Sequence, residues 1–357
     1  MNTRNRSLVI LAVLLMLAAG PAAAEDVFVS IGGGPAHSPF NDLALAVSRY
    51  VPTVYPEIRM PAEDSGGSFE NVKRLHLGDL DFALALAGDV HLGAAGRLRG
   101  DGDRYDKVRP LAYIYGLPAH LVVGLQTTII SPLRLEGKKV AVGLAESVSA
   151  VAAQNFFTRL GLWDLIKPLY LDTPDGATAL KEGRAEALWF VGSDPEEAVA
   201  QLHPDFKIRL LDLADDLQVS GFFQEFPFYA PATVAAGTYP GQAEPTGVFQ
   251  DNVLLCANEN VPVEVVYKVM KALFSDEGIA RLRAANRLTR DLSPNTGFQG
   301  ATRPLARGAY KFWVEKGVAV PEEVKPPDLK PEDLAPPEGE ADAGGKGGQG
   351  EAGPPGK

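Results

Sequence analysis

Residues 27–50 read VFVSIGGGPAHSPFNDLALAVSRY and hold a strand, a glycine-rich turn and a helix in one short stretch. The apolar run at 27–31 predicts a buried strand, and the glycines that follow predict a tight turn. Beyond the turn, Leu43, Val47 and Tyr50 recur at helical spacing and share one face. A strand that leads through small residues into a helix is the repeating unit of α/β proteins.

The same alternation continues along the chain and predicts two α/β lobes with mostly parallel sheets. No internal repeat is visible in the sequence. Further strands are predicted at 81–86, 120–125, 139–142, 187–191 and 208–211, and helices at 41–50, 70–76, 149–160, 263–274 and 279–285.

Two more loops share the design of the first, at 65–71 and 142–149. Exposed N–H groups at a helix start accept anions, and small residues let a ligand approach the backbone. Each serine or asparagine in these loops has an alternative role as a helix cap. Three such loops in one chain favour a ligand cleft at the carboxyl ends of the strands.

Several classes of protein find no support in the sequence. The net charge is -11 and no basic stripe stands out, which argues against a nucleic-acid binder. No zinc-type histidine spacing and no G-x-S-x-G motif occurs, so we expect no enzyme, no metal and no cofactor. The carboxylates of Asp194, Glu196 and Glu197 are read as solvated loop charge. The single cysteine, Cys256, lies in an apolar run and is expected to be a small buried residue.

The two ends of the chain differ from its body. Residues 1–24 combine arginines, a short apolar run and an A-x-A-like site, which predicts a secretory signal peptide and a periplasmic location; an uncleaved anchor is the alternative. Residues 321–357 are rich in Pro, Gly, Glu and Lys and predict a disordered tail.

Several ordered segments resemble the TAXI group of TRAP-transporter solute-binding proteins. The resemblance covers about 27–317, and its most specific parts are FPFY at 226–229 and AAGTYPGQ at 235–242. The segments SGGSFEN at 65–71 and VPVEVVY at 261–267 also match.

The resemblance implies a type II periplasmic-binding-protein-like fold, in which two lobes joined by a hinge close on a small molecule. The expected partners are the ligand, an organic acid, an amino acid or a less charged relative, and the TRAP permease membrane subunits, which an ion gradient drives. Lobe 1 is expected at 25–117 and 258–320, and lobe 2 at 118–257. A periplasmic partner of a sensor or envelope complex is the alternative function.

The loops depart from the pattern of the resembled family, whose known ligands include glutamate. Phe40 stands where a tyrosine is usual, and the third loop has Glu146-Ser147-Val148-Ser149 instead of G-S-G-T. A carboxylate at a helix start repels an anionic ligand. We therefore expect a less charged, more apolar or cationic ligand in place of glutamate.

The candidate ligand contacts come from the three loops and from the ends of two later strands. Serine and asparagine side chains would form hydrogen bonds, and the aromatic rings would form apolar walls, although Trp189 is equally consistent with a core position. The candidates are His37, Ser38, Phe40, Asn41, Ser65, Ser68, Asn71, Asp89, Ser147, Ser149, Trp189 and Asp194.

Overall fold

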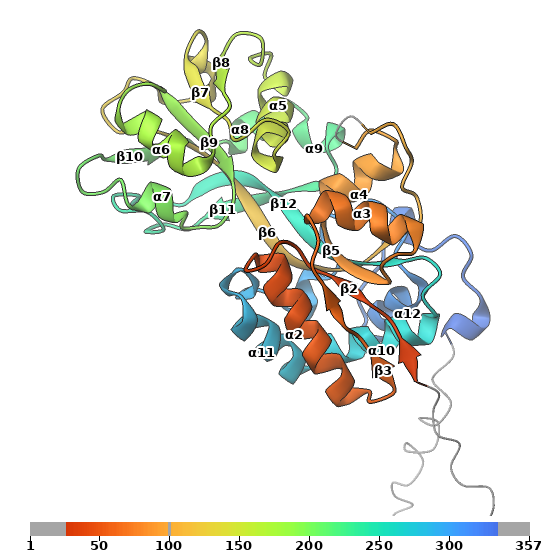
Figure 1. Ribbon diagram of the computed structural model, residues 1–357. Helices are drawn as coiled ribbons and strands as arrows, with labels where there is room; N and C mark the ends of the chain where they lie inside the picture. Colours follow the sequence, from red (N-terminus) through yellow and green to blue (C-terminus); the bar gives the residue numbers. More distant parts are fainter. Residues whose placement is uncertain (1–25, 99–100, 335–357) are drawn as a thin grey trace, which may run out of the picture.

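Two α/β lobes share a pair of long strands in the computed structural model, which describes residues 26–98 and 101–334 (Figure 1). The strands β6 (Val108–Gly124) and β12 (Thr246–Asn258) pair in antiparallel fashion and pass from one lobe into the other. Most of their residues are buried, because each strand has sheet neighbours in both lobes. The predicted lobe boundaries, near 117 and 257, fall within these two strands.

Lobe 1 is built on a sheet in the order β4-β2-β5-β12-β6. The strands β4 (Ala62–Glu63), β2 (Ile31–Gly32) and β5 (Phe82–Leu86) are parallel, and β12 runs antiparallel to β5. A separate parallel pair joins β1 (Val27–Phe28) to β3 (Ile58–Arg59). Both faces of the main sheet are covered, which explains why β5 is apolar along its whole length.

The side chains of β5 divide the helices of lobe 1 between the two faces of the sheet. Phe82, Leu84 and Leu86 belong to one apolar cluster, and Ala83 and Ala85 belong to the other. The large residues pack with α2 (Pro39–Val54), α10 (Val263–Leu273), α11 (Asp276–Ala285) and α12 (Arg307–Glu315). The alanines pack with α3 (Ser68–Leu77) and α4 (Ala87–Ala94).

Lobe 2 continues the sheet in the order β6-β9-β7-β8. Its strands are β9 (Ala187–Val191), β7 (Lys139–Ala141) and β8 (Lys167–Leu169), with β10 (Ile208–Leu210) paired to β6 and β11 (Tyr229–Val234) paired to β12. Its helices are α5 (Val148–Arg159), α6 (Thr173–Lys181), α7 (Glu197–Ala200), α8 (Ala214–Val219) and α9 (Phe222–Glu225). Stacked rings, among them Phe156 on Trp189 with centroids 5.3 Å apart, fill its core.

The predicted α/β class and two-lobed architecture are confirmed, but the expectation of mostly parallel sheets is wrong, because β6 and β12 run antiparallel to each other and to β9 and β5. Lobe 1 is assembled from both ends of the chain, because the chain leaves it in β6 and returns in β12. Short 3-10 turns complete it: η2 (Arg287–Thr289), η3 (Pro294–Thr296), η4 (Glu322–Val324) and η5 (Pro331–Leu334), while η1 (Pro132–Leu135) lies in lobe 2.

The prediction of a tail that begins at residue 321 is corrected by the packing of 321–334. Val324 is buried in the same apolar cluster as α12, and its carbonyl accepts the N–H of Leu305 at 2.9 Å. Asp333 is buried and pairs with Arg307 at 3.3 Å. A few apolar and acidic side chains with partners on lobe 1 suffice to order this segment, although its composition is that of a flexible chain.

Two other expectations concern the ends of the chain and its cysteine. The predicted signal peptide at 1–24 lies outside the described residues, as do positions 335–357 of the predicted tail. Within the described ranges, no helix has the length and apolar character that a membrane crossing requires.

Cys256 is fully buried in β12, and burial raises the pKa of its thiol, so the thiol stays protonated.

Candidate functional site

The turns at 35–38 and 144–147, which lead into α2 and α5, have the same hydrogen-bond pattern, one in each lobe. The N–H of Ser38 and that of Ser147 each donates to the carbonyl three residues earlier, at 3.0 Å. Each serine hydroxyl then accepts the N–H three residues ahead, at 3.3 Å and 3.2 Å. These bonds make both serines the N-caps of their helices, as the capping alternative proposed.

Ser68 and Asn71 tie the carboxyl ends of the lobe 1 strands together. The Ser68 hydroxyl accepts the N–H of Leu86 at 2.8 Å. The Asn71 amide donates to the carbonyl of Gly33 at 2.6 Å and to that of Leu84 at 2.8 Å. Both side chains are buried, so these contacts give hydrogen-bond partners to backbone groups at the strand ends.

Asn41 and Ser65 join the first two loops to each other. The Asn41 amide donates to the Asp64 carboxylate at 2.7 Å, and the Ser65 hydroxyl donates to the Gly33 carbonyl at 3.0 Å. The two nominated loops are therefore one connected surface at the end of β2.

Ser149 and Trp189 play the corresponding part in lobe 2. The Ser149 hydroxyl accepts the N–H of Val191 at 3.0 Å, and the Ser149 carbonyl accepts the indole N–H of Trp189 at 3.0 Å. Trp189 is fully buried against Phe156, in the core of the lobe. The start of α5 is thereby fixed to the end of β9.

A cavity of about 170 Å³ lies where the start of α4 in lobe 1 faces the start of α5 in lobe 2. We name it the α4–α5 cavity. It takes side chains from both lobes and from the crossing strands. Its lining residues are Leu86, Gly88, Asp89, Leu92, Arg97, Val148, Val151, Phe228, Tyr229 and Asp251.

Carboxylates and an aromatic pair give the α4–α5 cavity its chemistry. Asp89 and Asp251 are 6% and 4% exposed, and the N–H of Gly88 points at Asp251 from 3.5 Å. Burial and the neighbouring carboxylates raise the pKa of the Tyr229 phenol, so the phenol stays neutral and can donate a hydrogen bond. Phe228 packs on Tyr229 with ring centroids 4.5 Å apart and forms an apolar wall.

The volume of the α4–α5 cavity limits what it can hold. Water occupies about 30 Å³ per molecule in the liquid, and drug-sized ligands occupy pockets of about 300–1,000 Å³. At about 170 Å³ the α4–α5 cavity is smaller than the pockets of drug-sized ligands and suits a small solute.

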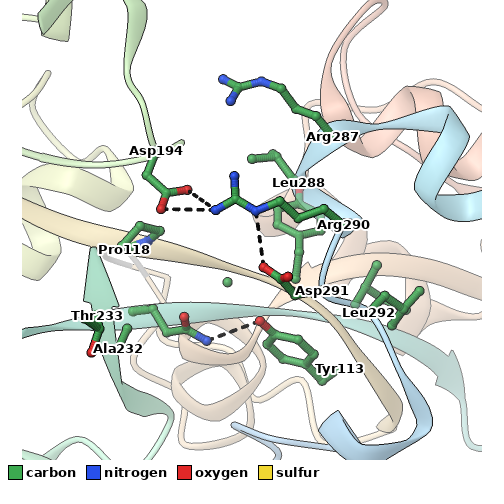
Figure 2. Close-up of a pocket in the computed structure, with 14 residues that line it drawn as sticks. Tyr113, Pro118, Asp194, Ala232, Thr233, Arg287, Leu288, Arg290, Asp291 and Leu292 are labelled. Carbon is green, nitrogen blue, oxygen red and sulfur yellow. Dashed lines mark hydrogen bonds and ion pairs between the residues drawn. The ribbon is translucent and has the colours of Figure 1, made fainter. Parts of the chain in front are cut away.

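A second interlobe cavity, of about 160 Å³, lies on the opposite face of the crossing strands, and Figure 2 shows residues that line it. We name it the η2 cavity. Gln250 lines it, whereas the next residue, Asp251, lines the α4–α5 cavity, because neighbouring strand residues point to opposite faces. Asp194 at the end of β9 reaches across the η2 cavity to the guanidinium of Arg290, with atoms 3.3 Å and 3.4 Å apart.

The structure thus distributes the nominated residues over several places. Asp89 lines the α4–α5 cavity, and Asp194 lines the η2 cavity. Phe40 packs edge-on against Tyr115, with centroids 6.5 Å apart, and His37 is exposed on its loop. The remaining eight candidates form the capping and bridging contacts described above or, for Trp189, lie in the core.

Sequence reasoning did not nominate most of the side chains that line the two cavities. In the sequence, the segment that contains Phe228 and Tyr229 carries only the resemblance to TAXI proteins. Asp251 and Arg290 lie outside every nominated loop, and no local pattern marks them. As for a metal, the described part of the chain contains no cluster of three or more His, Cys, Asp or Glu side chains placed to hold one.

Comparisons with known proteins agree with this architecture. A sequence model of the NMT1-like family matches residues 33–317. A TctC solute-binding protein from Polaromonas has a similar structure, with a TM-score of 0.50 at 15% identity over 83% of this chain and 99% of its own. The periplasmic sulfonate-binding protein SsuA from Methylobacillus flagellatus KT matches at 15% identity with a TM-score of 0.49, over 82% of this chain and 87% of its own. At this identity the likeness to the TctC protein concerns the fold alone.

Proposed function

The chain belongs to the NMT1-like family, and on that premise we propose that it is an extracytoplasmic solute-binding protein that holds a small molecule between its lobes. The observation that carries this proposal is the α4–α5 cavity, which both lobes and the crossing strands line. A ligand there would contact both lobes at once and would favour the arrangement that brings them together. The resemblance to TAXI proteins adds the proposal that an ion-gradient-driven TRAP permease receives the solute.

Within this function, the proposed contacts are Asp89 and Asp251 for polar groups and Phe228 with Val148 for the apolar part of the solute. Among the described residues that line the cavity, two are carboxylates and one, Arg97, carries a guanidinium. That balance does not favour a dicarboxylate such as glutamate. It supports a neutral or cationic solute of small size, in line with the altered loops.

The test is a thermal-shift screen of the chain from residue 25 onward with amino acids, dicarboxylates, keto acids and polyamines. A solute at about 100 times its Kd stabilises the fold by about 2.7 kcal/mol, which raises the Tm by several degrees. We expect a hit outside the dicarboxylates. A hit with glutamate would contradict the proposed specificity but support the function.

A matched pair of variants assigns any hit to the cavity. Val148→Trp fills the cavity from α5 and should abolish the shift, while Leu144→Trp, on the same loop but 56% exposed, should leave it intact. Equal shifts in both variants would place the solute elsewhere. If the folded chain responds to no solute at all, the sensor or envelope-partner function takes precedence.

A further inference from the structure

The η2 cavity is spanned by polar contacts between the lobes. The guanidinium of Arg290, which follows η2 in lobe 1, pairs with the carboxylate of Asp194 in lobe 2 (Figure 2). Beside it, the guanidinium of Arg287 donates to the carbonyl of Pro195 at 3.3 Å. Two arginines of one lobe therefore hold two consecutive residues of the other.

Both sides of these contacts are supported within their own lobes. In lobe 2, the Tyr239 hydroxyl accepts the N–H of Glu196 at 2.9 Å and holds the loop beyond β9 in place. In lobe 1, the Arg283 guanidinium donates to the carbonyl of Leu292 at 2.7 Å, which ties the segment after η2 to α11. The interlobe contacts thus join two segments, each of which is held in place within its own lobe.

The contacts also lie apart from the proposed solute. No residue that lines the η2 cavity lines the α4–α5 cavity, and the crossing strands separate the two. A substitution at Arg290 or Asp194 therefore removes no side chain that lines the α4–α5 cavity.

We propose that Asp194, Pro195, Arg287 and Arg290 form a latch that sets how much of the protein has its lobes closed, independently of the solute. The proposal rests on the proposed function, since it assumes that the lobes open and close. The latch is a salt-sensitive element that biases the separation of the two lobes.

Arg290 keeps a second ionic partner when it separates from Asp194. Its Nε lies 3.2 Å from the carboxylate of Asp291, in the same lobe, so this pair persists when the lobes separate. The Arg290 side chain is 57% exposed and that of Asp194 is 17% exposed, so salt reaches the pair from the arginine side and screens its attraction in part. A partly exposed ion pair is weak, and a weak pair can shift an equilibrium between states of similar free energy without locking it.

The latch is tested by measuring the distance between the lobes without any solute. Spin labels at Val54→Cys, at the end of α2, and at Leu165→Cys, in lobe 2, report the separation, since both positions are exposed. The native Cys256 is fully buried and stays unlabelled. Arg290→Gln and Asp194→Asn should each lower the ratio of closed to open forms by about two- to five-fold at low salt.

Three comparisons decide the outcome. Arg184→Gln, which removes an ion pair within lobe 2 whose arginine is 55% exposed, close to the 57% of Arg290, should leave the distances unchanged. The double variant Asp194→Asn/Arg290→Gln should shift them no further than either single variant. Raising the salt from about 0.1 M to 1 M, which shortens the screening length from ~10 Å to ~3 Å, should open the unmodified chain but not the variants.

Identical distance distributions in the unmodified chain and the two latch variants would overturn the proposal, whether or not a solute is found. Conversely, a latch that works in a chain that binds no solute would leave the latch standing and remove the proposed function. The two failures are therefore distinguishable.

Discussion

His37 and Glu146 occupy equivalent positions in the two lobes, each with a φ of 64° immediately before the serine that caps a helix. Both residues are exposed, and both end the turn that links a strand to its helix. The structure therefore contains a repeated loop that the sequence marks only weakly, because the two loops share just Gly34 and Gly143, the alanine before these residues and the capping serine after them.

Because Glu146 adopts the left-handed conformation, we expect its replacement by glycine to stabilise the protein. The left-handed conformation costs a non-glycine residue about 1–2 kcal/mol. Glycine avoids this cost but loses more conformational entropy on folding, which offsets about 0.5–1 kcal/mol of the gain. The resembled family usually has glycine here. Histidine is enriched in this conformation, so Glu146 is the better site than His37.

We expect Glu146→Gly to be more stable to urea than Glu146→Gln by about 0.5–1 kcal/mol. The glutamine variant removes the charge but keeps the strain, so the difference isolates the backbone. At Glu136, where φ is -50°, the same two substitutions should give the opposite order. Equal stabilities at Glu146 would show that its loop relaxes without cost.

Asn71 offers a test of the contacts that hold the lobe 1 strand ends. Asn71→Ala removes two donors: the Gly33 carbonyl keeps the Ser65 hydroxyl as a partner, whereas the Leu84 carbonyl loses its side-chain partner. A buried unsatisfied group costs about 1–3 kcal/mol, and chemical denaturation should show a loss of that size. Asn295→Ala, at an exposed asparagine, is the control and should have little effect. An equally small change at Asn71 would mean that water replaces the amide.

The sequence predicts the alternation of strands and helices well, because each element carries its own apolar periodicity. It misses most of β6, since Gly116 and Pro118 interrupt the apolar run. The strand persists there because Gln250 and Asn252 of β12 face these two residues in the ladder. Partner strands about 130 positions away in the chain, as Gln250 is from Pro118, leave no local signal.

The candidate site shows the same limit. Hydroxyl-rich loops were correctly located at the ends of strands, but the direction of each hydroxyl depends on distant neighbours. Ser149 reaches Val191, 42 positions ahead, and Ser68 reaches Leu86, 18 positions ahead. A pattern within one loop cannot distinguish a hydroxyl that faces a ligand from one that faces a backbone group.

Gly308 lies where α12 contacts α10, and we expect this position to tolerate no side chain. A Cβ on Gly308 would overlap the carbonyl oxygen of Val263 and lie 2.8 Å from the backbone nitrogen of Tyr267. Overpacking of this kind costs about 1–3 kcal/mol. Thermal unfolding of Gly308→Ala should show that loss, whereas Gly102→Ala, where a Cβ meets open space, should not. Intact stability in the first variant would mean that the two helices can separate slightly.

We expect the buried imidazole of His120 to cause part of the loss of stability at acid pH. It is fully buried in β6, stacked on Phe190 with ring centroids 4.3 Å apart, and burial lowers the pKa of His120 to about 3. The unfolded histidine has a pKa of about 6.5, so between these two values the unfolded state binds a proton that the folded state does not. The contribution of the neutral His120 to the free energy of unfolding is therefore fully present above about pH 6.5. It falls as the pH drops toward 3, by up to about 1.4 kcal/mol per pH unit.

His120→Phe should flatten the dependence of unfolding free energy on pH within that window. The ring can keep its stacking on Phe190, and Nε2 has no hydrogen-bond partner among the described residues, so little is lost there. Its Nδ1 lies 3.0 Å from the carbonyl of Pro118, which also accepts the N–H of Gly192 and so keeps a partner in the variant. Urea titrations of both proteins at several pH values check this. Parallel curves from pH 6.5 to pH 4 would show that His120 is protonated in the folded state, against the expected effect of its burial.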